Sequence, residues 1–450
     1  MTKQPTPLWR TFLVFLAPMM LSNILQALFG TINNVYLGQM IGVPALAAVS
    51  VFFPLMFFFI AFIMGLSSGA TVLIGQAFGA GDRAKVKTIA GTALSVALAG
   101  GVVIAVIGAL WTRELMMLLA TPADILDDAT AYARIMMVTM PITFVFILIT
   151  SMLRGVSDTI TPLVALVIST VIGLALTPAL IDGWFGLPRL GVASAAVAAV
   201  ASSVATLLWL TLYLRAKNHA LALDGVMMRG MQVQPALLRT LVRIGMPSAV
   251  QIASMALAEL VLLGLINGFG SDATAAYGAV NQVLSYVQFP AISIAITASI
   301  FGAQAIGRGD GHRLHSIART GLALNLALTG GLAALAYVLS RVMMGWFITN
   351  PPVIELAQHL LHLVLWSSVV FGMSGVFSAI MRASGTVFVP MALTVFAIAA
   401  VEIPTAQILS RLMGVDGVWI AYPVTFCAMC ALQAGFYLLV WRKRPITRLV

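Results

Sequence analysis

Long apolar runs separated by short polar segments dominate this chain. No Asp, Glu, Lys or Arg occurs between Arg10 and Asp82, a gap long enough for two membrane-spanning helices of ~20 residues each. The pattern predicts twelve apolar helices, at 10–38, 44–74, 88–112, 125–153, 160–181, 190–214, 237–268, 273–304, 316–340, 354–381, 387–411 and 416–441. Because these runs are continuously apolar rather than alternating, they favour an all-α polytopic membrane protein over a membrane β-barrel.

The composition agrees with a membrane protein. Charged residues make up only 8% of the 450 residues, and hydrophobic residues make up 61%. A water-soluble fold of this size could not cover its surface with so few charges. The composition therefore argues against a soluble enzyme, a disordered scaffold and a secreted disulfide-rich module, and it makes the lipid bilayer the expected surroundings.

The net charge of +10 would fit nucleic-acid binding if the basic residues were gathered in one place. Instead they follow the membrane topology. When the N-terminus is placed in the cytoplasm, the basic residues from Lys3 to Arg448 fall mainly in cytoplasmic segments. Only five of the 24 lie outside: Arg113, Arg134, Arg189, Arg341 and Arg411. This distribution obeys the positive-inside rule, so we expect both termini in the cytoplasm and no nucleic-acid partner.

The second half of the chain repeats the first at an offset of 228 residues. The clearest match is between Gln76, Gly79, Gly81, Asp82 and Gln304, Gly307, Gly309, Asp310. Pro18 and Pro247 match at a nearby offset. Each repeat holds an even number of spans, so both insert in the same orientation, related by a pseudo-twofold axis along the membrane normal. We predict a six-helix N-terminal lobe at 1–214, a cytoplasmic linker at 215–236 and a six-helix C-terminal lobe at 237–450. Two such lobes suit a carrier with alternating access better than a passive channel.

Two carboxylates, Glu259 and Glu402, fall within the predicted hydrocarbon region. A charged carboxylate there costs about 3 kcal/mol on insertion scales, so it usually faces a cavity or a partner. Counted along their helices at 1.5 Å per residue, both lie roughly 14–15 Å below the outer surface. If they face one cavity, the pair can hold a proton, because burial and a second carboxyl both favour the protonated acid. A cationic solute would favour the ionised form and expel that proton, which would couple the two fluxes.

Neutral polar residues at similar depth are candidates for the substrate cavity. In the C-terminal lobe these are Gln251, Tyr277, Asn281 and Gln282, to which we add the apolar Met255, and in the N-terminal lobe they are Asn33, Asn34 and Tyr36. The alternative is that such amides only hold helices together. No metal-ligand cluster, phosphate-binding loop or nucleophile motif is evident in the sequence. We therefore expect no enzyme activity and no cofactor beyond a coupling ion.

Several motifs resemble the multidrug and toxic compound extrusion (MATE) transporters. They include Pro18 and the run from Asn33 to Gly38, Gly75-Gln76-Ala77-Phe78-Gly79-Ala80-Gly81-Asp82, and Leu153-Arg154-Gly155-Val156-Ser157-Asp158-Thr159-Ile160-Thr161-Pro162. The resemblance covers nearly the whole chain. It implies a V-shaped pair of six-helix bundles in the bacterial inner membrane. It also implies efflux of organic cations, other drugs or toxic metabolites in exchange for H⁺ or Na⁺, by a protein that we expect to be a monomer.

The chain departs from the family pattern where the family has acidic residues. Asn33 stands in place of an Asp in the first span, and Phe371 replaces an Asp that one branch carries in the tenth. The fifth span carries Thr170, Gly173 and Thr177 in place of the family's amides and Asp. The coupling site of the N-terminal lobe therefore does not carry over, and the hypothesis moves coupling to Glu259 and Glu402. Two carboxylates with few oxygen-bearing neighbours favour H⁺ over Na⁺.

Two alternatives stay open at this point. A flippase for lipid-linked saccharides would belong to the same superfamily, but it should carry arginines deep inside its central spans to bind anionic headgroups. A passive channel would need a symmetric filter and no moving lobes. The asymmetric placement of Glu259 and Glu402 argues against a channel.

Overall fold

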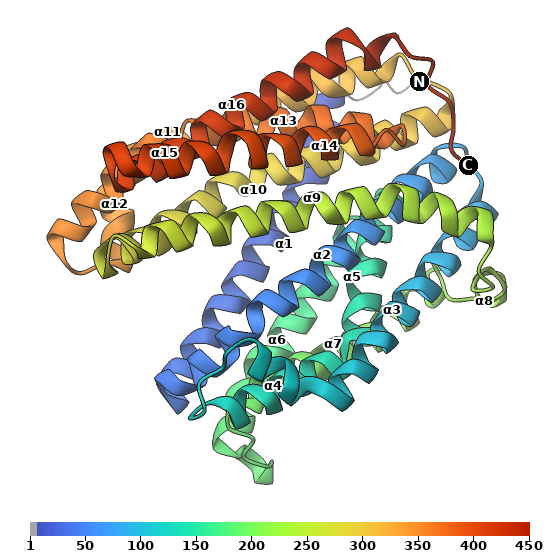
Figure 1. Cartoon of the computed structure of the whole chain (residues 1–450). Coiled ribbons are helices and arrows are strands. Elements are labelled where there is room, and N and C mark those ends of the chain that lie inside the picture. Colours follow the sequence, from blue (N-terminus) through green and yellow to red (C-terminus); the bar gives the residue numbers. More distant parts are fainter. Residues whose placement is uncertain (1–6) are drawn as a thin grey trace. The chain divides into compact units, whose positions relative to one another are not determined.

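A computed structural model describes residues 7–450, and all regular structure in that part of the chain is helical (Figure 1). Residues 1–6, which include the predicted cytoplasmic Lys3, lie outside the described residues. The helices of the first half are α1 Leu8–Tyr36, the π-helical η1 Leu37–Ile41, α2 Val43–Gly79, α3 Arg83–Leu118, α4 Leu126–Val138, α5 Met140–Gly155, α6 Ile160–Asp182, the 3₁₀ turn η2 Trp184–Gly186 and α7 Ala193–Ala216. The short α8 Gly225–Gly230 follows.

The second half has the same helical character. Its helices are α9 Pro235–Asn267, α10 Ser271–Arg308, α11 Arg313–Phe347, α12 Pro351–Val364, α13 Ser367–Ala383, α14 Phe388–Phe396, the π-helical η3 Ala397–Glu402, α15 Ile403–Met413, α16 Val415–Leu439 and the 3₁₀ turn η4 Trp441–Lys443. Within the described residues, eleven helical segments are long and apolar enough to cross a membrane, and the bent pair α4–α5 would make a twelfth.

The predicted span at 125–153 is two helices rather than one. Helices α4 and α5 meet at Thr139 with a bend of 52°. Pro141 lies in the first turn of α5, where a proline is tolerated because its missing N–H would have no helical acceptor. The apolar pattern continues through the bend, so hydropathy alone does not reveal it. By contrast, Pro18 and Pro247 lie inside α1 and α9 without interrupting either helix.

The chain separates into two compact units by its internal contacts. The first unit comprises the described residues up to Met20, Gly79–Gly81 and Val250–Val450, and the second comprises Leu21–Phe78 and Asp82–Ala249. These units are defined by contacts rather than by the sequence repeat. The lobe boundaries at 214 and 237 therefore stay a prediction.

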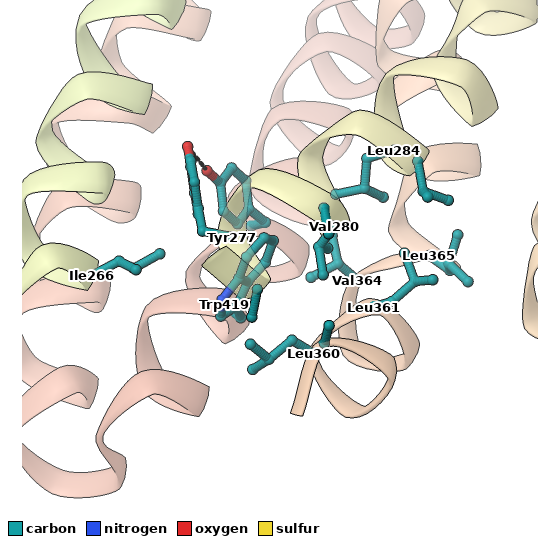
Figure 2. Close-up of a cluster of buried hydrophobic side chains, with 14 of the residues drawn as sticks. Ile266, Tyr277, Val280, Leu284, Leu360, Leu361, Val364, Leu365 and Trp419 are labelled. Atoms are coloured by element: carbon teal, nitrogen blue, oxygen red, sulfur yellow. Dashed lines mark hydrogen bonds between the residues drawn. The ribbon is translucent and has the colours of Figure 1, made fainter. Parts of the chain in front are cut away.

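The core of the first unit surrounds Trp419, whose side chain is fully buried. Ile266 of α9, Val280 of α10 and Leu361 of α12 belong to the same cluster (Figure 2). Small residues such as Ala273 and Ala276 let the helices of this cluster approach closely, as is typical of helix packing within membranes. This rigid core lies beside the candidate site and fixes the helices that carry it.

The predicted linker, 215–236, belongs to the second unit and packs against its helix α3. Lys87 of α3 forms an ion pair with Asp224, just before α8. Ser95 Oγ donates to the Met231 carbonyl at 2.8 Å. Helix α8 thus lies along the end of α3 (Figure 1). The segment is polar in composition, but these contacts anchor it.

His219 in this segment gives the second unit a pH-sensitive contact. Its Nε2 lies 3.6 Å from Asp158 Oδ2, and its side chain is 22% exposed. Burial lowers the pKa of His219; the Asp158 carboxylate partly opposes this, and Arg83 adds to the lowering. In the unfolded chain a histidine titrates near pH ~6.5, so the folded state binds the proton less well than the unfolded state.

We therefore expect the stability of the protein to fall as pH drops below ~6.5, through the lower folded pKa of His219. The variant His219→Gln should flatten this part of the profile. Thermal unfolding in detergent between about pH 5 and 8 measures it. An unchanged pH profile in the variant would contradict the assignment.

Candidate coupling cavity

The two predicted carboxylates reach the same region of the first unit from different helices. Glu259 lies on α9, eight residues before that helix ends at Asn267. Glu402 is the last residue of the π-helical turn η3. Helix α15 begins at the next residue, with Pro404 in its first turn.

The π-helical turn has a local cause in the sequence. Pro404 has no backbone N–H, so it cannot donate to the carbonyl of Ala400 one turn earlier, and its ring also crowds that carbonyl. A helix relieves such a conflict by widening locally or by kinking. The α14–η3–α15 helix therefore changes its winding at Glu402. Its carboxyl-bearing residue is placed by an irregular turn rather than by a regular helix face.

Both glutamates line one cavity of about 200 Å³. Helix α9 contributes Met255 and Glu259, one turn apart on the same face. Helix α10 contributes Gly278, Asn281, Gln282, Leu284, Ser285 and Gln288, and α16 contributes Tyr422, Phe426 and Met429. Val364, Phe371 and Ile398 complete the lining, together with Glu402. The space suits several water molecules or a small cationic group.

The two carboxyl groups differ in their surroundings. Glu402 is only 5% exposed, whereas Glu259 is exposed while still lining the cavity. Two like groups in unlike environments are suited to different tasks in proton chemistry. The buried carboxyl is better placed to hold a proton, and the exposed one is better placed to meet an incoming cation.

Aromatic rings form a continuous wall along α16. The hydroxyl groups of Tyr277 and Tyr422 lie 3.4 Å apart, within hydrogen-bonding distance. Trp419 packs against both rings, with centroids 5.4 Å from Tyr277 and 5.5 Å from Tyr422 (Figure 2). Phe426 continues the wall to Phe371, at 5.1 Å. Such ring faces attract organic cations.

The structure brings together some of the predicted cavity residues and separates others. Met255, Asn281 and Gln282 line the cavity with the two glutamates. Gln251 does not line it, because its side chain donates to Thr394 Oγ1 at 3.0 Å. Tyr277 is buried and does not line the cavity, but its hydroxyl group lies 3.4 Å from that of the lining residue Tyr422.

The candidates in the first half of the chain lie elsewhere. Asn33, Asn34 and Tyr36 belong to the second unit, and their assignment to a substrate cavity stays a prediction. The side-chain oxygen of Asn33 accepts a hydrogen bond from Thr177 Oγ1 at 3.1 Å. These two residues occupy places where the family pattern has acids, and here they form a neutral pair.

Sequence reasoning missed Ser285 and the α16 residues of the cavity. The spacing of Tyr422, Phe426 and Met429 by four and three residues would have placed them on one helix face. That signal does not show which face points inward, because the span is apolar all round. Only packing decides it.

Pro404 offers a direct test of how the irregular turn positions Glu402. We expect Pro404→Ala to restore the missing donor, let the turn relax toward a regular helix and displace the carboxyl group. The predicted coupling role of Glu402 implies that cation transport then slows by roughly 10- to 100-fold, since a 1 Å misplacement of a reacting group can cost about 100-fold. Rates of cation uptake into proteoliposomes measure the effect. Pro352→Ala, in the first turn of α12, is the matched control, and equal rates in both variants would contradict the role of the turn.

Comparison with known proteins identifies the family. The MatE family model matches the chain twice, over 18–179 and 247–408. The chain belongs to the MatE family. The two matches are equally long and begin at Pro18 and Pro247, so the family comparison also confirms the internal repeat. This MatE protein is a multi-pass membrane transporter, and its membership points away from an enzyme.

Relatives and solved structures agree with that membership. The chain is 42% identical to the probable multidrug resistance protein YoeA of Bacillus subtilis, over all of this chain and 97% of that protein. It is 21% identical to the multidrug export protein MepA of Staphylococcus aureus, over 97% of this chain and 95% of that protein. A crystal structure of a mutant of the Vibrio cholerae MATE transporter VcmN matches with a TM-score of 0.90 at 18% identity, covering 98% of each chain. The predicted all-α polytopic fold is therefore confirmed.

Proposed function

We propose that this MatE protein exports organic cations across the bacterial inner membrane in exchange for protons, with Glu402 and Glu259 as the coupling groups. The observation that carries the proposal is the placement of both carboxyl groups in one cavity of the first unit. The names of its relatives refer to multidrug resistance or export, which supports small-molecule cargo. The distribution of basic residues supports cytoplasmic termini.

The proposed exchange follows from the unlike surroundings of the two acids. A proton from the outer side binds Glu402, whose burial favours the neutral form. A cation then approaches Glu259 and the aromatic wall, and its charge favours ionisation of Glu402. The proton and the cation thus compete for one pair of carboxyl groups. Binding of one promotes release of the other, and alternating access converts this competition into antiport.

The choice of H⁺ over Na⁺ rests on the burial of Glu402. The two carboxyl groups have more oxygen-bearing neighbours than the sequence predicts, because Asn281, Gln282 and Ser285 also line the cavity. These side chains could contribute ligands to a hard cation. A single shielded carboxyl, however, is better suited to a proton than to a metal ion that needs several fixed oxygen ligands.

Proteoliposomes test the coupling ion directly. Ethidium, a fluorescent organic cation, serves as cargo, with the membrane potential clamped by valinomycin and K⁺. A pH gradient alone should drive ethidium uptake, and a Na⁺ gradient alone should not. Uptake driven by Na⁺ and indifferent to the pH gradient would overturn proton coupling.

A further inference from the structure

A layer of hydrogen-bonded polar side chains lies one helical turn from the cavity. It consists of Gln251 on α9, Thr394 on α14 and Gln433 on α16, and we refer to these three residues as the amide layer. Gln251 Nε2 donates to Thr394 Oγ1 at 3.0 Å. Gln433 Nε2 donates to the Pro390 carbonyl at 2.9 Å and lies 3.3 Å from Thr394 Oγ1. The layer therefore ties three helices together.

On each helix that contributes to the amide layer, the layer residue lies close in sequence to a residue of the cavity wall. Each of its residues lies four positions from a cavity-lining residue, which places the pairs on α9 and α16 on one helix face, while Thr394 precedes Ile398 of the π-helical turn η3. The pairs are Gln251 with Met255, Thr394 with Ile398, and Gln433 with Met429. On all three helices, the residue of the amide layer lies farther from the predicted outer surface than the cavity-lining residue of its pair. The layer thus forms a floor beneath an apolar tier of two methionines and one isoleucine.

One atom of the layer has unused hydrogen-bonding capacity. Thr394 and Gln433 are fully buried, and Gln433 Oε1 finds no donor among the described residues. A buried acceptor without a donor is unfavourable, so helix packing alone gives no reason for it. A carbonyl, a hydroxyl and a free amide oxygen at one level can accept hydrogen bonds from water or hydronium.

We propose that the amide layer is the gate through which the coupling proton leaves the cavity toward the cytoplasm, within the first unit and apart from the cargo route. The inference rests on the proposed proton exchange. The proton passes from the Glu402 carboxyl to a water molecule, which leaves a carboxylate and a hydronium ion. Flexible methionines admit the water chain, and the oxygens of the amide layer accept hydrogen bonds from it without becoming protonated themselves.

The hydrogen bonds of the layer also explain how the gate stays closed. An open polar channel from the carboxyl cavity to the cytoplasm would let protons leak without cargo. The contacts of Gln251 and Gln433 with α14 hold the three helices together and exclude a continuous water chain. Opening exchanges these contacts for contacts with water, which carries a small net penalty.

Three variants and a matched control test the gate. Gln433→Leu and Thr394→Val remove polar atoms at nearly constant volume, and Thr394→Ser keeps the hydroxyl. Thr425→Val is the control, because Thr425 is equally buried on α16 but donates only to the Ala421 carbonyl of its own helix. Proteins are reconstituted with the pH dye pyranine in the lumen, and ethidium addition triggers proton movement. Equilibrium ethidium binding is measured in parallel.

We expect Gln433→Leu and Thr394→Val to bind ethidium as the wild type does. Their rates of proton movement should fall by about tenfold or more, because water loses its hydrogen-bonding partners in the layer. Their rates should also depend less on the pH of the cytoplasmic side. Thr394→Ser and Thr425→Val should match the wild type. Wild-type proton rates in Gln433→Leu, or losses that parallel ethidium binding, would overturn the gate. If the wild type itself moves no protons when ethidium is added, the proposed proton exchange is wrong. That result differs from failure of the gate alone, in which the wild type and Gln433→Leu move protons at the same rate.

Discussion

Glu402→Gln is expected to abolish ethidium uptake driven by a pH gradient, lowering the rate by about 100-fold or more, the range for loss of an essential proton-transfer group. Glutamine keeps the shape and polarity of the protonated acid but cannot release a proton. Glu402 is the buried carboxyl of the cavity lining, so no second buried acid among the lining residues can replace its function. Ethidium binding without a gradient should survive. Uptake into proteoliposomes at a fixed membrane potential measures the loss.

The partner variants make this result specific. Glu259→Gln should weaken ethidium binding more than proton release, since Glu259 is the exposed member of the pair. Glu355→Gln makes the same chemical change at an exposed residue of α12 that does not line the cavity, and it should behave as the wild type. Rapid pH-driven uptake by Glu402→Gln would remove this residue from the coupling mechanism.

Gly417→Ala is expected to destabilise the first unit by about 3 kcal/mol, at the upper end for overpacking of a well-packed interior. Gly417 opens α16 against the end of α15, and an added Cβ would overlap the backbone carbonyl of Leu409. Backbone cannot move aside as a flexible side chain can. The two helices would have to separate, which would also displace the η3 turn that carries Glu402.

Thermal unfolding in detergent measures this effect, with Gly435→Ala as the control on the same helix. Nothing lies within 4 Å of a Cβ at Gly435, so that substitution should be neutral or slightly stabilising, because alanine favours helices by about 1 kcal/mol over glycine. Equal unfolding temperatures for the two variants would show that α15 and α16 can separate at little cost, and would contradict the prediction.

The apolar pattern was sufficient to predict the helices of this fold, because each span must satisfy its own backbone hydrogen bonds in lipid. The bend between α4 and α5 could not be predicted in the same way, since hydropathy does not report the direction of the helix axis. The depth of Glu259 and Glu402 along their helices correctly indicated that they could share a cavity. Depth does not specify rotation about the helix axis, however, and rotation decides exposure.

Two of the predicted cavity residues, Gln251 and Tyr277, do not line the cavity. Gln251 and Met255 are one turn apart on α9, yet only Met255 lines the cavity while Gln251 bonds to Thr394. Tyr277 and Tyr422 form a pair, but Tyr422 is the one that lines the cavity. In helices that are apolar on every side, the sequence contains no amphipathic signal to decide such cases.

The confinement of the candidate coupling cavity to one unit has an evolutionary consequence. The family model matches both halves, so the chain descends from a duplicated ancestor, yet the first half has no acidic residue at 11–81 or 159–181. The two copies are no longer interchangeable. A hybrid gene joining two first halves would encode a protein that lacks both carboxyl groups of the proposed coupling cavity. The proposal implies that the first copy is free to diversify its inner lining, because selection for new cargo can act there without changing the proposed coupling groups.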